Sequence, residues 1–384
     1  MKSYLPNDIK DENRKIIFDI LLQNPELAKV EITEKTAISF VTVSKIVNFF
    51  DQIGILKATG ESREGSGGLG RKRTVYRFVE NSYVTIGIQM IGKRITALLV
   101  NLHSKIIDSY SMETEIPFYS EEFIPVFDEI VERMKKKAAE TNSVVLGIGI
   151  GVDGAINTRK KTIRMKTKEY KEQDFFYEGI IESLKSKVQL PIILENDVNA
   201  STVAEFRNLE NTESSVTDLV HITLGDGIGS GIIINKKLHR GFNASAGELE
   251  YLCFDEDYKR DPSSVGWLES KIGSEYLLQS FDLHSESGMK ACIHYISKKL
   301  ALTITSIISI LDIDQIIIGG KTISLFPDAV LESTKKYVEQ YTDWLPNISV
   351  SHSDHSTALG AAILMLQQEI LKVISGSGHD DKNS

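Results

Sequence analysis

Cysteine is nearly absent from this 384-residue chain, which contains only Cys253 and Cys292. Two cysteines cannot build a disulfide scaffold or a four-cysteine zinc site, and their scarcity is typical of a reducing cytoplasm. The N-terminus lacks the apolar core of a secretion signal. The longest apolar stretch, Leu300 to Ile318, is interrupted by polar residues and predicts a core helix followed by a strand. The sequence therefore predicts a cytoplasmic protein that does not engage a membrane.

Positive charge is also scarce, because 44 Lys and Arg residues face 53 Asp and Glu residues and the net charge is −9. Such a balance ordinarily argues against a nucleic-acid partner. Residues 1–78, however, carry 13 basic and 10 acidic residues, a balance of +3, so the remainder carries −12. A basic head on an acidic body is expected where only the head meets phosphates. The length and the apolar content of 41% predict two or three domains.

The head, residues 1–78, has the pattern of three helices followed by a hairpin. A first helix is predicted from about Asp8 to Gln23, where Asn24-Pro25 stops it, and a second from about Lys29 to Thr36. After a turn, Ser39 caps a third helix that runs to Asp51. The inward-facing residues expected on the third helix are Val43, Ile46, Val47 and Phe50.

The start of this third helix has an outward face suited to reading DNA. A recognition helix presents such side chains to the major groove. The candidate DNA contacts are Ser39, Phe40, Thr42, Ser44 and Lys45. Two predicted strands then flank a glycine-rich tip with three adjacent cations, Arg71, Lys72 and Arg73. A wing that reaches phosphates needs this combination, and although a solvated linker is the alternative, the helices just upstream favour DNA binding.

The segment from Leu194 to Glu248 is the most informative part of the body. A short apolar run predicts a strand that ends at Asn196, and the following residues predict a helix that starts at Asp197. These two side chains either cap the helix or contact a ligand. Further on, a glycine-rich turn joins two strands at Gly225, Gly227 and Gly229, where backbone can approach a ligand closely.

The order of these motifs resembles the ROK family, which contains bacterial sugar kinases and sugar-responsive transcriptional repressors. The resemblance extends from about Val84 to the ALGAA motif at Ala358, and the head segment SFVTVSKIV resembles the winged helix-turn-helix of ROK repressors. It implies an α/β protein: a winged helix-turn-helix followed by a two-lobed actin-like ATPase (ribonuclease H-like) fold with a sugar in the cleft. The matching residues are Asn196, Asp197, Val198, Asn199, Ala200, Glu205, Gly225, Gly227, Ile228, Gly229, Gly231, Gly241, Ala246, Gly247 and Glu248.

The sugar half of the family's site is retained. In the family the Asn-Asp pair contacts sugar hydroxyls and the aspartate is the general base, and Asn196 and Asp197 match this pair. The resemblance makes Glu248 and Glu269 further sugar contacts, the alternative for each being a surface or salt-bridged residue. A carboxylate accepts hydroxyls without chemistry, so Asp197 alone does not establish catalysis. The glycines at the nucleotide side, or in simple turns, are Gly225, Gly227, Gly229, Gly319 and Gly320.

The phosphate half departs from the family pattern. Kinases of the family have a loop resembling Gly-Ile-Asp-Ile-Gly-Gly-Thr-Lys, and this chain has Gly-Ile-Gln-Met-Ile-Gly-Lys-Arg at 87–94. Gln89 cannot supply the carboxylate charge that holds Mg²⁺, and Ile91 and Lys93 replace a glycine and a hydroxyl. Lys93 and Arg94 either attract an anion or form an exposed hairpin turn. Phosphoryl transfer depends on positioning and charge neutralisation, so catalysis should be severely impaired.

The zinc motif of many ROK proteins is missing, so we expect no structural zinc and no cofactor. Tyr251 occupies the histidine position, and Arg260, Pro262 and Trp267 occupy the cysteine positions, while Cys253 is displaced from the pattern. Trp267 and Tyr251 either pack in the core or stack on a sugar ring.

Together these patterns predict a sugar-responsive transcriptional regulator, a repressor, that binds palindromic double-stranded operator DNA as a homodimer or higher homo-oligomer. The domains expected are a winged helix-turn-helix at 1–78, a ROK sugar-binding body of two lobes at 79–374 and a disordered tail at 375–384. The effector is a monosaccharide, with xylose, glucose and N-acetylated hexosamines as family precedents. The alternatives are an ATP-dependent sugar kinase, whose catalytic base would be Asp197, and a sugar-independent architectural DNA-binding protein.

Overall fold

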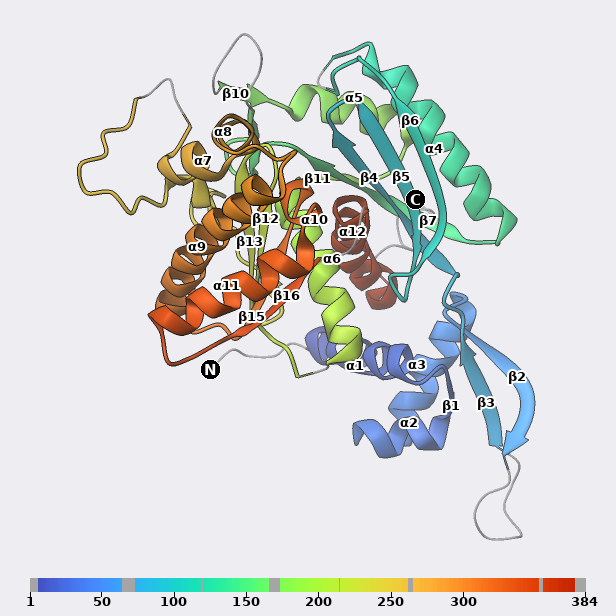
Figure 1. Ribbon diagram of the computed structural model, residues 1–384. Coiled ribbons are helices and arrows are strands. Elements are labelled where there is room, and N and C mark those ends of the chain that lie inside the picture. Colours follow the sequence, from blue (N-terminus) through green and yellow to red (C-terminus); the bar gives the residue numbers. More distant parts are fainter. Residues whose placement is uncertain are drawn as a thin grey trace.

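The computed structural model describes residues 6–63, 73–118, 120–165, 173–213, 215–261, 265–351 and 355–376. Two five-stranded sheets, each covered by helices, lie side by side above a smaller unit of three helices and a three-stranded sheet (Figure 1). The smaller unit is built from the N-terminal residues, and the two larger sheets come from the rest of the chain.

The smaller unit confirms the predicted head helices to within two residues. Ser39 caps the third helix as predicted, because its hydroxyl accepts a hydrogen bond from the backbone N–H of Thr42. A short strand that the sequence did not indicate joins the hairpin and gives the sheet order β1-β3-β2. The elements are α1 (Pro6–Gln23), β1 (Glu26–Ala28), α2 (Lys29–Thr36), α3 (Phe40–Gln52), β2 (Leu56–Arg63) and β3 (Arg73–Phe78).

The first lobe of the body contains a mixed sheet in the order β11-β7-β4-β5-β6, beside a small antiparallel sheet of β10, β9 and β8. Its buried strands β4 and β7 are parallel and almost continuously apolar, as expected for strands covered on both faces. The elements are β4 (Tyr83–Ile91), β5 (Arg94–Asn101), β6 (Ile106–Glu113), α4 (Phe123–Glu140), β7 (Val144–Val152), β8 (Ala155–Asn157), β9 (Thr162–Met165), β10 (Gln173–Phe176), α5 (Glu178–Val188) and β11 (Ile192–Asn196).

The second lobe contains the sheet β14-β13-β12-β15-β16. The apolar stretch from Leu300 to Ile318 forms the end of a long core helix, α9, and then strand β15, as predicted. Helix α12, at the end of the chain, packs on strands β4 and β7 of the first lobe. The elements from α6 onward are α6 (Asp197–Thr212), β12 (Leu219–Leu224), β13 (Ile228–Ile234), β14 (Lys237–Leu238), a 3-10 helix (Leu249–Tyr251), α7 (Trp267–Ile272), α8 (Ser274–Ser280), α9 (Glu286–Leu311), β15 (Gln315–Gly319), α10 (Lys321–Ser324), α11 (Pro327–Tyr341), β16 (Asn347–Val350) and α12 (Ser356–Ser375).

Helices α6 and α12 pack against each other between the two large sheets (Figure 1). Their approach requires glycine, because a Cβ on Gly360 of α12 would lie 1.7 Å from the carbonyl oxygen of Ala200 in α6. Gly87 likewise lets strand β4 approach α12, since a Cβ at Gly87 would lie 1.9 Å from the carbonyl oxygen of Ala358. Helix α12 is long and apolar enough to cross a membrane by those criteria alone, but 67% of its apolar window is buried within the fold. It is the central packing helix of the body.

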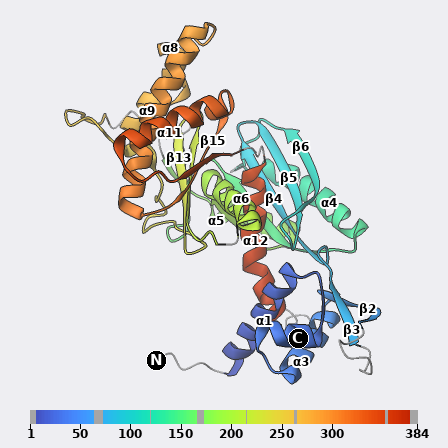
Figure 2. The same cartoon turned by 60° about the horizontal axis from the view of Figure 1, so that its bottom comes forward.

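The C-terminal end of α12 also enters the core of the smaller unit. Leu366, Ile370 and Ile374 share a hydrophobic cluster with the residues of α1 and α3. Arg14 of α1 lies 4.0 Å from the ring centre of Phe49 and donates a hydrogen bond to the final turn of α12. Figure 2 shows α12 descending from the body to α1 and α3. The helix includes Ser375, the first residue of the predicted disordered tail, while residues 377–384 lie outside the described part of the chain.

Candidate functional site

Asn196 and Asp197 lie where β11 ends and α6 begins. Asn196 is the N-cap residue: its Oδ1 accepts a hydrogen bond of 3.0 Å from the backbone N–H of Asn199. Its amide group donates to the carbonyl of Gly154 at 3.1 Å and to Oδ1 of Asp197 at 3.0 Å. The capping interpretation of Asn196 is therefore confirmed, and the amide additionally orients the neighbouring carboxylate.

The carboxyl group of Asp197 has an unusual electrostatic environment. Burial raises its pKa to about 7, and the nearby charge of Asp153 contributes to the same shift. Hydrogen bonds from the backbone N–H of Val198 and from the Asn196 amide lower the pKa but do not cancel the effect of burial. A carboxyl group that titrates near neutrality can accept a proton or a hydroxyl hydrogen bond, so Asp197 is chemically competent for either role.

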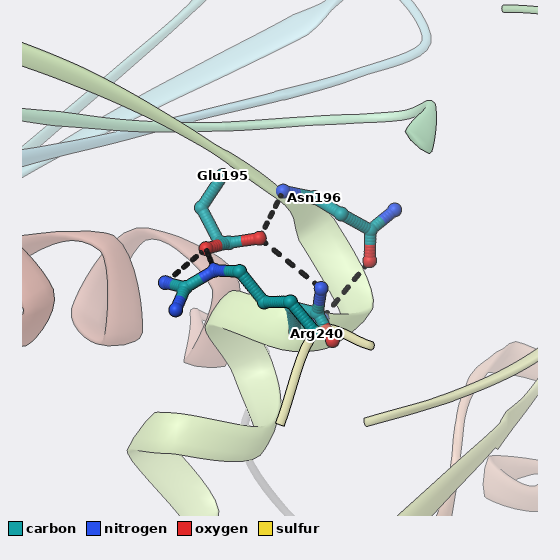
Figure 3. Close-up of polar contacts among 4 residues, drawn as sticks. Glu195, Asn196 and Arg240 are labelled. Carbon is teal, nitrogen blue, oxygen red and sulfur yellow. Dashed lines mark hydrogen bonds and ion pairs between the residues drawn. The ribbon is translucent and has the colours of Figure 1, made fainter. Parts of the chain in front are cut away.

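An ion pair between buried Glu195 and partly exposed Arg240, which the sequence did not predict, supports this corner (Figure 3). Glu195 is 5% exposed, and its Oε2 accepts hydrogen bonds from Nε and Nη2 of Arg240 at 2.8 and 2.6 Å. Its Oε1 accepts from the backbone N–H of Asn196 at 3.0 Å and from the Asn199 amide at 3.1 Å. Both carboxylate oxygens are thus used, which fixes the end of β11 and the first turn of α6. A glutamate at the end of an apolar strand was the available signal.

The predicted glycine turn connects β12 and β13, and Glu269 lies against it. The backbone N–H of Gly225 donates to the carbonyl of Gly227 at 2.9 Å and closes the turn. Glu269 accepts from the backbone N–H of Ile228 at 3.3 Å, and a Cβ on Gly227 would lie 2.5 Å from its Oε2. Gly227 therefore permits a close approach by Glu269, at the start of α7.

Glu248 lies in a different setting. It follows Gly247, whose φ of +93° and close contact with the carbonyl of Ser230 both exclude a side chain. Glu248 is exposed and lines a cavity of about 320 Å³ that does not include Asp197. The structure joins Asn196 to Asp197, and it places Glu269 at the glycine turn and Glu248 at this separate cavity. The other lining residues are Val220, Ser230, Ile232, Ser245, Gly247, Leu249, Tyr251, Leu252 and Ile307.

The two remaining glycines of the predicted nucleotide side, Gly319 and Gly320, end strand β15. Gly320 has a φ of +95°, and a Cβ there would lie 2.4 Å from the carbonyl oxygen of Leu224. Close packing between β15 and β12 accounts for a glycine at position 320 without reference to a nucleotide.

In segment 87–94, which replaces the family's phosphate loop, the side chains of Gln89 and Lys93 have partners within the protein. Gln89 of β4 is 7% exposed, and its Oε1 accepts a hydrogen bond of 3.2 Å from the backbone N–H of Ala358 in the first turn of α12. Lys93 forms an ion pair of 2.5 Å with Glu115 at an exposed turn between β4 and β5. Ile91 is 38% exposed beside it. Of the two interpretations of Lys93, the structure favours the exposed hairpin turn.

Aromatic packing fills the region where the family's zinc motif is degraded. The guanidinium of Arg260 lies 5.0 Å from the ring centre of Tyr251, and Phe254 meets Trp267 at 5.7 Å. Trp267 is 4% exposed, which confirms its core interpretation, whereas Tyr251 is 42% exposed. Pro262 lies outside the described residues. Within the described ranges, no group of three or more His, Cys, Asp or Glu side chains is arranged to hold a metal ion.

On the smaller unit, one face of α3 is buried and the other is exposed, as predicted. Val43, Ile46, Val47 and Phe50 are buried. Of the predicted outward residues, Ser39, Phe40 and Lys45 are exposed, and Thr42 and Ser44 are partly exposed. The sequence interpretation missed Val41, which is 65% exposed beside Phe40 at 51%. Arg71 and Lys72 lie outside the described residues, and Arg73 begins β3.

The sequence profile of the ROK family matches residues 85–260 and 269–368. The xylose repressor of Caldicellulosiruptor bescii is 24% identical over 362 residues, which cover 86% of this chain and 88% of that protein. Among solved structures, a ROK family transcriptional regulator described as a homologue of the E. coli MLC protein superposes with a TM-score of 0.75, at 17% identity over 96% of this chain and 100% of that one.

A ROK family glucokinase from Streptomyces griseus, in complex with glucose and AMPPNP, superposes with a TM-score of 0.56 at 22% identity and covers 74% of this chain and 99% of that one. The match to the regulator extends over the smaller unit, whereas the match to the kinase covers less of the chain. These similarities confirm the predicted mixed α/β, actin-like fold of the body.

Proposed function

The chain belongs to the ROK family, and we propose that it is a sugar-responsive transcriptional regulator, a repressor, of that family. Its similarity to a xylose repressor over 86% of its length supports this proposal, because the alignment is too long to be confined to the body. In this proposal residues 1–78 are a winged helix-turn-helix, residues 79–374 are the two-lobed sugar-binding body, and the protein acts in the cytoplasm.

The observation that carries the proposal is the exposed N-terminal face of α3. Its inner face is held by the head core, so the backbone is fixed while Ser39, Phe40 and Lys45 point to solvent. A recognition helix needs this combination, because base contacts come from the N-terminal residues of a rigid helix in the major groove. Phe40 and Val41 supply an apolar surface of the kind that contacts thymine methyl groups.

Operator binding is proposed to involve a homodimer on a palindromic site. Each half-site would take one α3, while the hairpin of β2 and β3 would reach the adjacent phosphates with Arg71, Lys72 and Arg73. The basic balance of the head against the acidic body favours contact of the DNA backbone with this end of the molecule.

The effector is proposed to be a monosaccharide bound near Asn196 and Asp197, with Glu248 and Glu269 approaching when the lobes close. Helix α12 provides a direct route from this site to the head. Near its start, Thr357 donates a hydrogen bond of 3.2 Å to the carbonyl of Asp197, and at its end Ile374 lies in the head core. Sugar affinity must differ between the operator-bound and free forms for the coupling to work.

The proposal is tested by selecting random-sequence duplexes with the full-length protein and measuring binding by fluorescence anisotropy. We expect enrichment of a palindrome and a loss of about tenfold or more in affinity for Lys45→Ala, since base and phosphate contacts each contribute roughly 1–3 kcal/mol. Lys336→Ala, on exposed α11, is the matched control. A sugar panel then identifies the effector by operator release. Failure to enrich any motif would refute DNA recognition, and equal sugar affinity with and without operator would refute the coupling.

A sugar kinase is the second candidate, and the environment of Asp197 favours it. A carboxyl group with a pKa of about 7 suits a general base at neutral pH. Gln89 opposes it, because its amide is engaged with α12 and carries no charge for Mg²⁺. Turnover of ATP with any sugar in an ADP-release assay, abolished by Asp197→Asn, would establish the kinase.

A further inference from the structure

A second cavity lies on the outer side of α6, away from the glycine turn. It has a volume of about 440 Å³ and lies between α6, α12 and the hairpin of β13 and β14. This volume is within the range of pockets that hold small molecules. The residues that line it are Val203, Phe206, Arg207, Glu210, Ile233, Lys236, Lys237, Leu238, Arg240, Leu364 and Gln367.

The lining of this cavity divides into an apolar floor and a cationic rim. The floor is made by aliphatic side chains and Phe206. The rim has four cations, namely Arg207, Lys236, Lys237 and Arg240, and one carboxylate, Glu210. Four positive charges and one negative charge in the lining give +3, and Glu195, which pairs with Arg240, lowers the local balance to +2, in a chain whose net charge is −9. The local balance is therefore opposite to that of the protein as a whole.

The single carboxylate does not satisfy the rim. Glu210 accepts from Nη1 of Arg207 and from Nζ of Lys236, each at 2.9 Å. Arg240 is held by Glu195. The side chains of Lys237 and Gln367 have no hydrogen-bond or ion-pair partner among the residues that the structure describes. These two exposed side chains belong to the lining and are available to a ligand.

We propose that this cavity binds a small organic anion, a phosphate monoester or carboxylate carried on an apolar stem. The anionic group would lie at the rim, where Lys237 and Gln367 donate hydrogen bonds and Arg240 adds charge. The stem would cover Phe206 and Leu364 of the floor. The size of the cavity selects a small molecule over a folded partner.

The position of the cavity links it to both ends of the protein. Arg240 is the partner of Glu195, whose other oxygen holds the backbone of Asn196 and the amide of Asn199. An anion that draws Arg240 toward the rim therefore loosens the support of the Asn196 and Asp197 corner. This link rests on the proposed function, because it treats that corner as a sugar site.

The opposite side of the cavity approaches the head. Asp19 of α1 lies close enough to Arg207 and Glu210 that both charges act on its pKa, although burial, which raises it, is the largest cause. An anion paired with Arg207 would change this electrostatic contact between α1 and α6. The cavity is thus placed to influence the joint between head and body.

A calorimetric titration of the full-length protein with phenyl phosphate tests the site. We expect saturable binding of one molecule per chain, with no binding of phenol and weaker binding of inorganic phosphate, because the first lacks the charge and the second lacks the stem. Equal binding of phenol would show an apolar cavity only and would overturn the proposal. Binding of polyglutamate without phenyl phosphate would identify an acidic peptide site and would also overturn it.

Matched lysine variants locate the binding. Lys237→Gln should weaken phenyl phosphate about tenfold, as expected when one charge-assisted hydrogen bond is lost. Lys336→Gln removes an exposed lysine from α11 and should leave binding unchanged. Both variants should fold, because neither side chain has a partner among the described residues. An equal effect of the two variants would show an adventitious ion only.

A third measurement tests the link to the sugar site. Phenyl phosphate at saturation should change the affinity of the effector sugar by a factor that Arg240→Lys reduces. Unchanged sugar affinity would overturn the link through Arg240. The calorimetric titration needs neither sugar nor DNA, so its result does not depend on whether the protein is a regulator. Conversely, absence of anion binding would not affect the test of operator binding.

Discussion

Two polar side chains beside the start of α12, Asp197 and Gln89, lie in opposite electrostatic environments. At the start of α6, the pKa of Asp197 is raised to about 7 because burial and Asp153 disfavour its charge. At the end of β4, Gln89 is neutral and its carbonyl oxygen is already engaged by the backbone of α12. The buried carboxyl group of Asp197 destabilises the unliganded fold when it is charged, but it is available to a ligand. The Gln89 side chain stabilises the fold through Ala358, and its carbonyl oxygen is not available to a ligand.

This difference supports the proposal that the sugar half of a ROK site, and not the phosphate half, serves binding in this chain. A carboxyl group held in an unfavourable environment is typical of functional sites. The ion pair of Glu195 with Arg240 supports the Asp197 corner, because Glu195 also holds the backbone of Asn196. The turn between β4 and β5 is instead an exposed hairpin turn, whose Lys93 is paired with Glu115. The comparison favours a protein that senses a sugar over one that phosphorylates it.

The largest effect is expected from Glu195→Ala, which removes the support of the α6 corner. The Asn196 backbone N–H and the buried Asn199 amide would lose their acceptor, while the partly exposed Arg240 would turn to solvent, so we expect a loss of about 2–4 kcal/mol in the free energy of unfolding. Urea denaturation measures it. Glu182→Ala breaks an exposed pair with Lys185 and is the control, with a loss below about 1 kcal/mol. Similar losses in the two variants would contradict the supporting role of Glu195.

Gln89→Leu tests the other half of the comparison. The substitution preserves approximate volume but leaves the buried N–H of Ala358 without its acceptor, which should cost roughly 1–3 kcal/mol in the free energy of unfolding. Sugar affinity should remain unchanged, because the contact is structural. A loss of ATP binding in Gln89→Leu would contradict this, since it would show that the β4 end still serves a nucleotide.

Asp197→Asn tests the cost of keeping the carboxyl group. Because the folded-state pKa is raised above the ordinary value of 3.8, the folded protein gains stability from this group below about pH 4, and loses it as the pH rises through about 7. The variant should be more stable than the wild type at pH 8 by on the order of 1–2 kcal/mol, allowing for partial exposure. Sugar binding should fall sharply in the same variant.

The pH profile of the wild type alone would not isolate this effect. Burial lowers the pKa of His221 to about 4, so its contribution is present above about pH 6.5 and is lost as the pH falls through 4. Since His221 is present in both proteins, the difference between wild type and Asp197→Asn cancels it. A difference that does not change between pH 4 and pH 8 would show that the Asp197 pKa is ordinary.

Local signals in the sequence accounted for much of the fold and for the position of the cleft residues. Ser39 and Asn196 were recognisable as caps because a cap depends on its own next three residues. The β1 strand was missed because it has three residues and is held by its pairing with distant β3. Phe40 was predicted to be exposed, but its neighbour Val41 was not, since an apolar residue is ordinarily assigned to the core.

Long-range partners could not be predicted. Glu195 was visible as a charged residue in an apolar strand, but nothing in its neighbourhood identifies Arg240, which is 45 residues away. The hydrogen bond from Ala358 to Gln89 joins residues 269 positions apart, so the sequence showed the loss of a carboxylate without showing what replaced its role. Glu248 and Asp197 were assigned to one site by resemblance, whereas Glu248 lines a cavity whose lining does not include Asp197.

The smallest effect is expected from Lys93→Gln. Because no change in stability is expected, any change in ATP binding would report directly on whether segment 87–94 contacts a phosphate. Lys93 forms an exposed ion pair with Glu115 at the β4 and β5 turn, and its pKa is raised first by the hydrogen bond with that carboxylate. Exposed pairs contribute little to stability and are screened by salt, so Tm and sugar affinity should not change. Calorimetry with ATP would give the decisive contrast: if Lys93→Gln removed measurable ATP binding, the turn would be a phosphate site after all. No such change is expected, because Lys93 is already paired with Glu115.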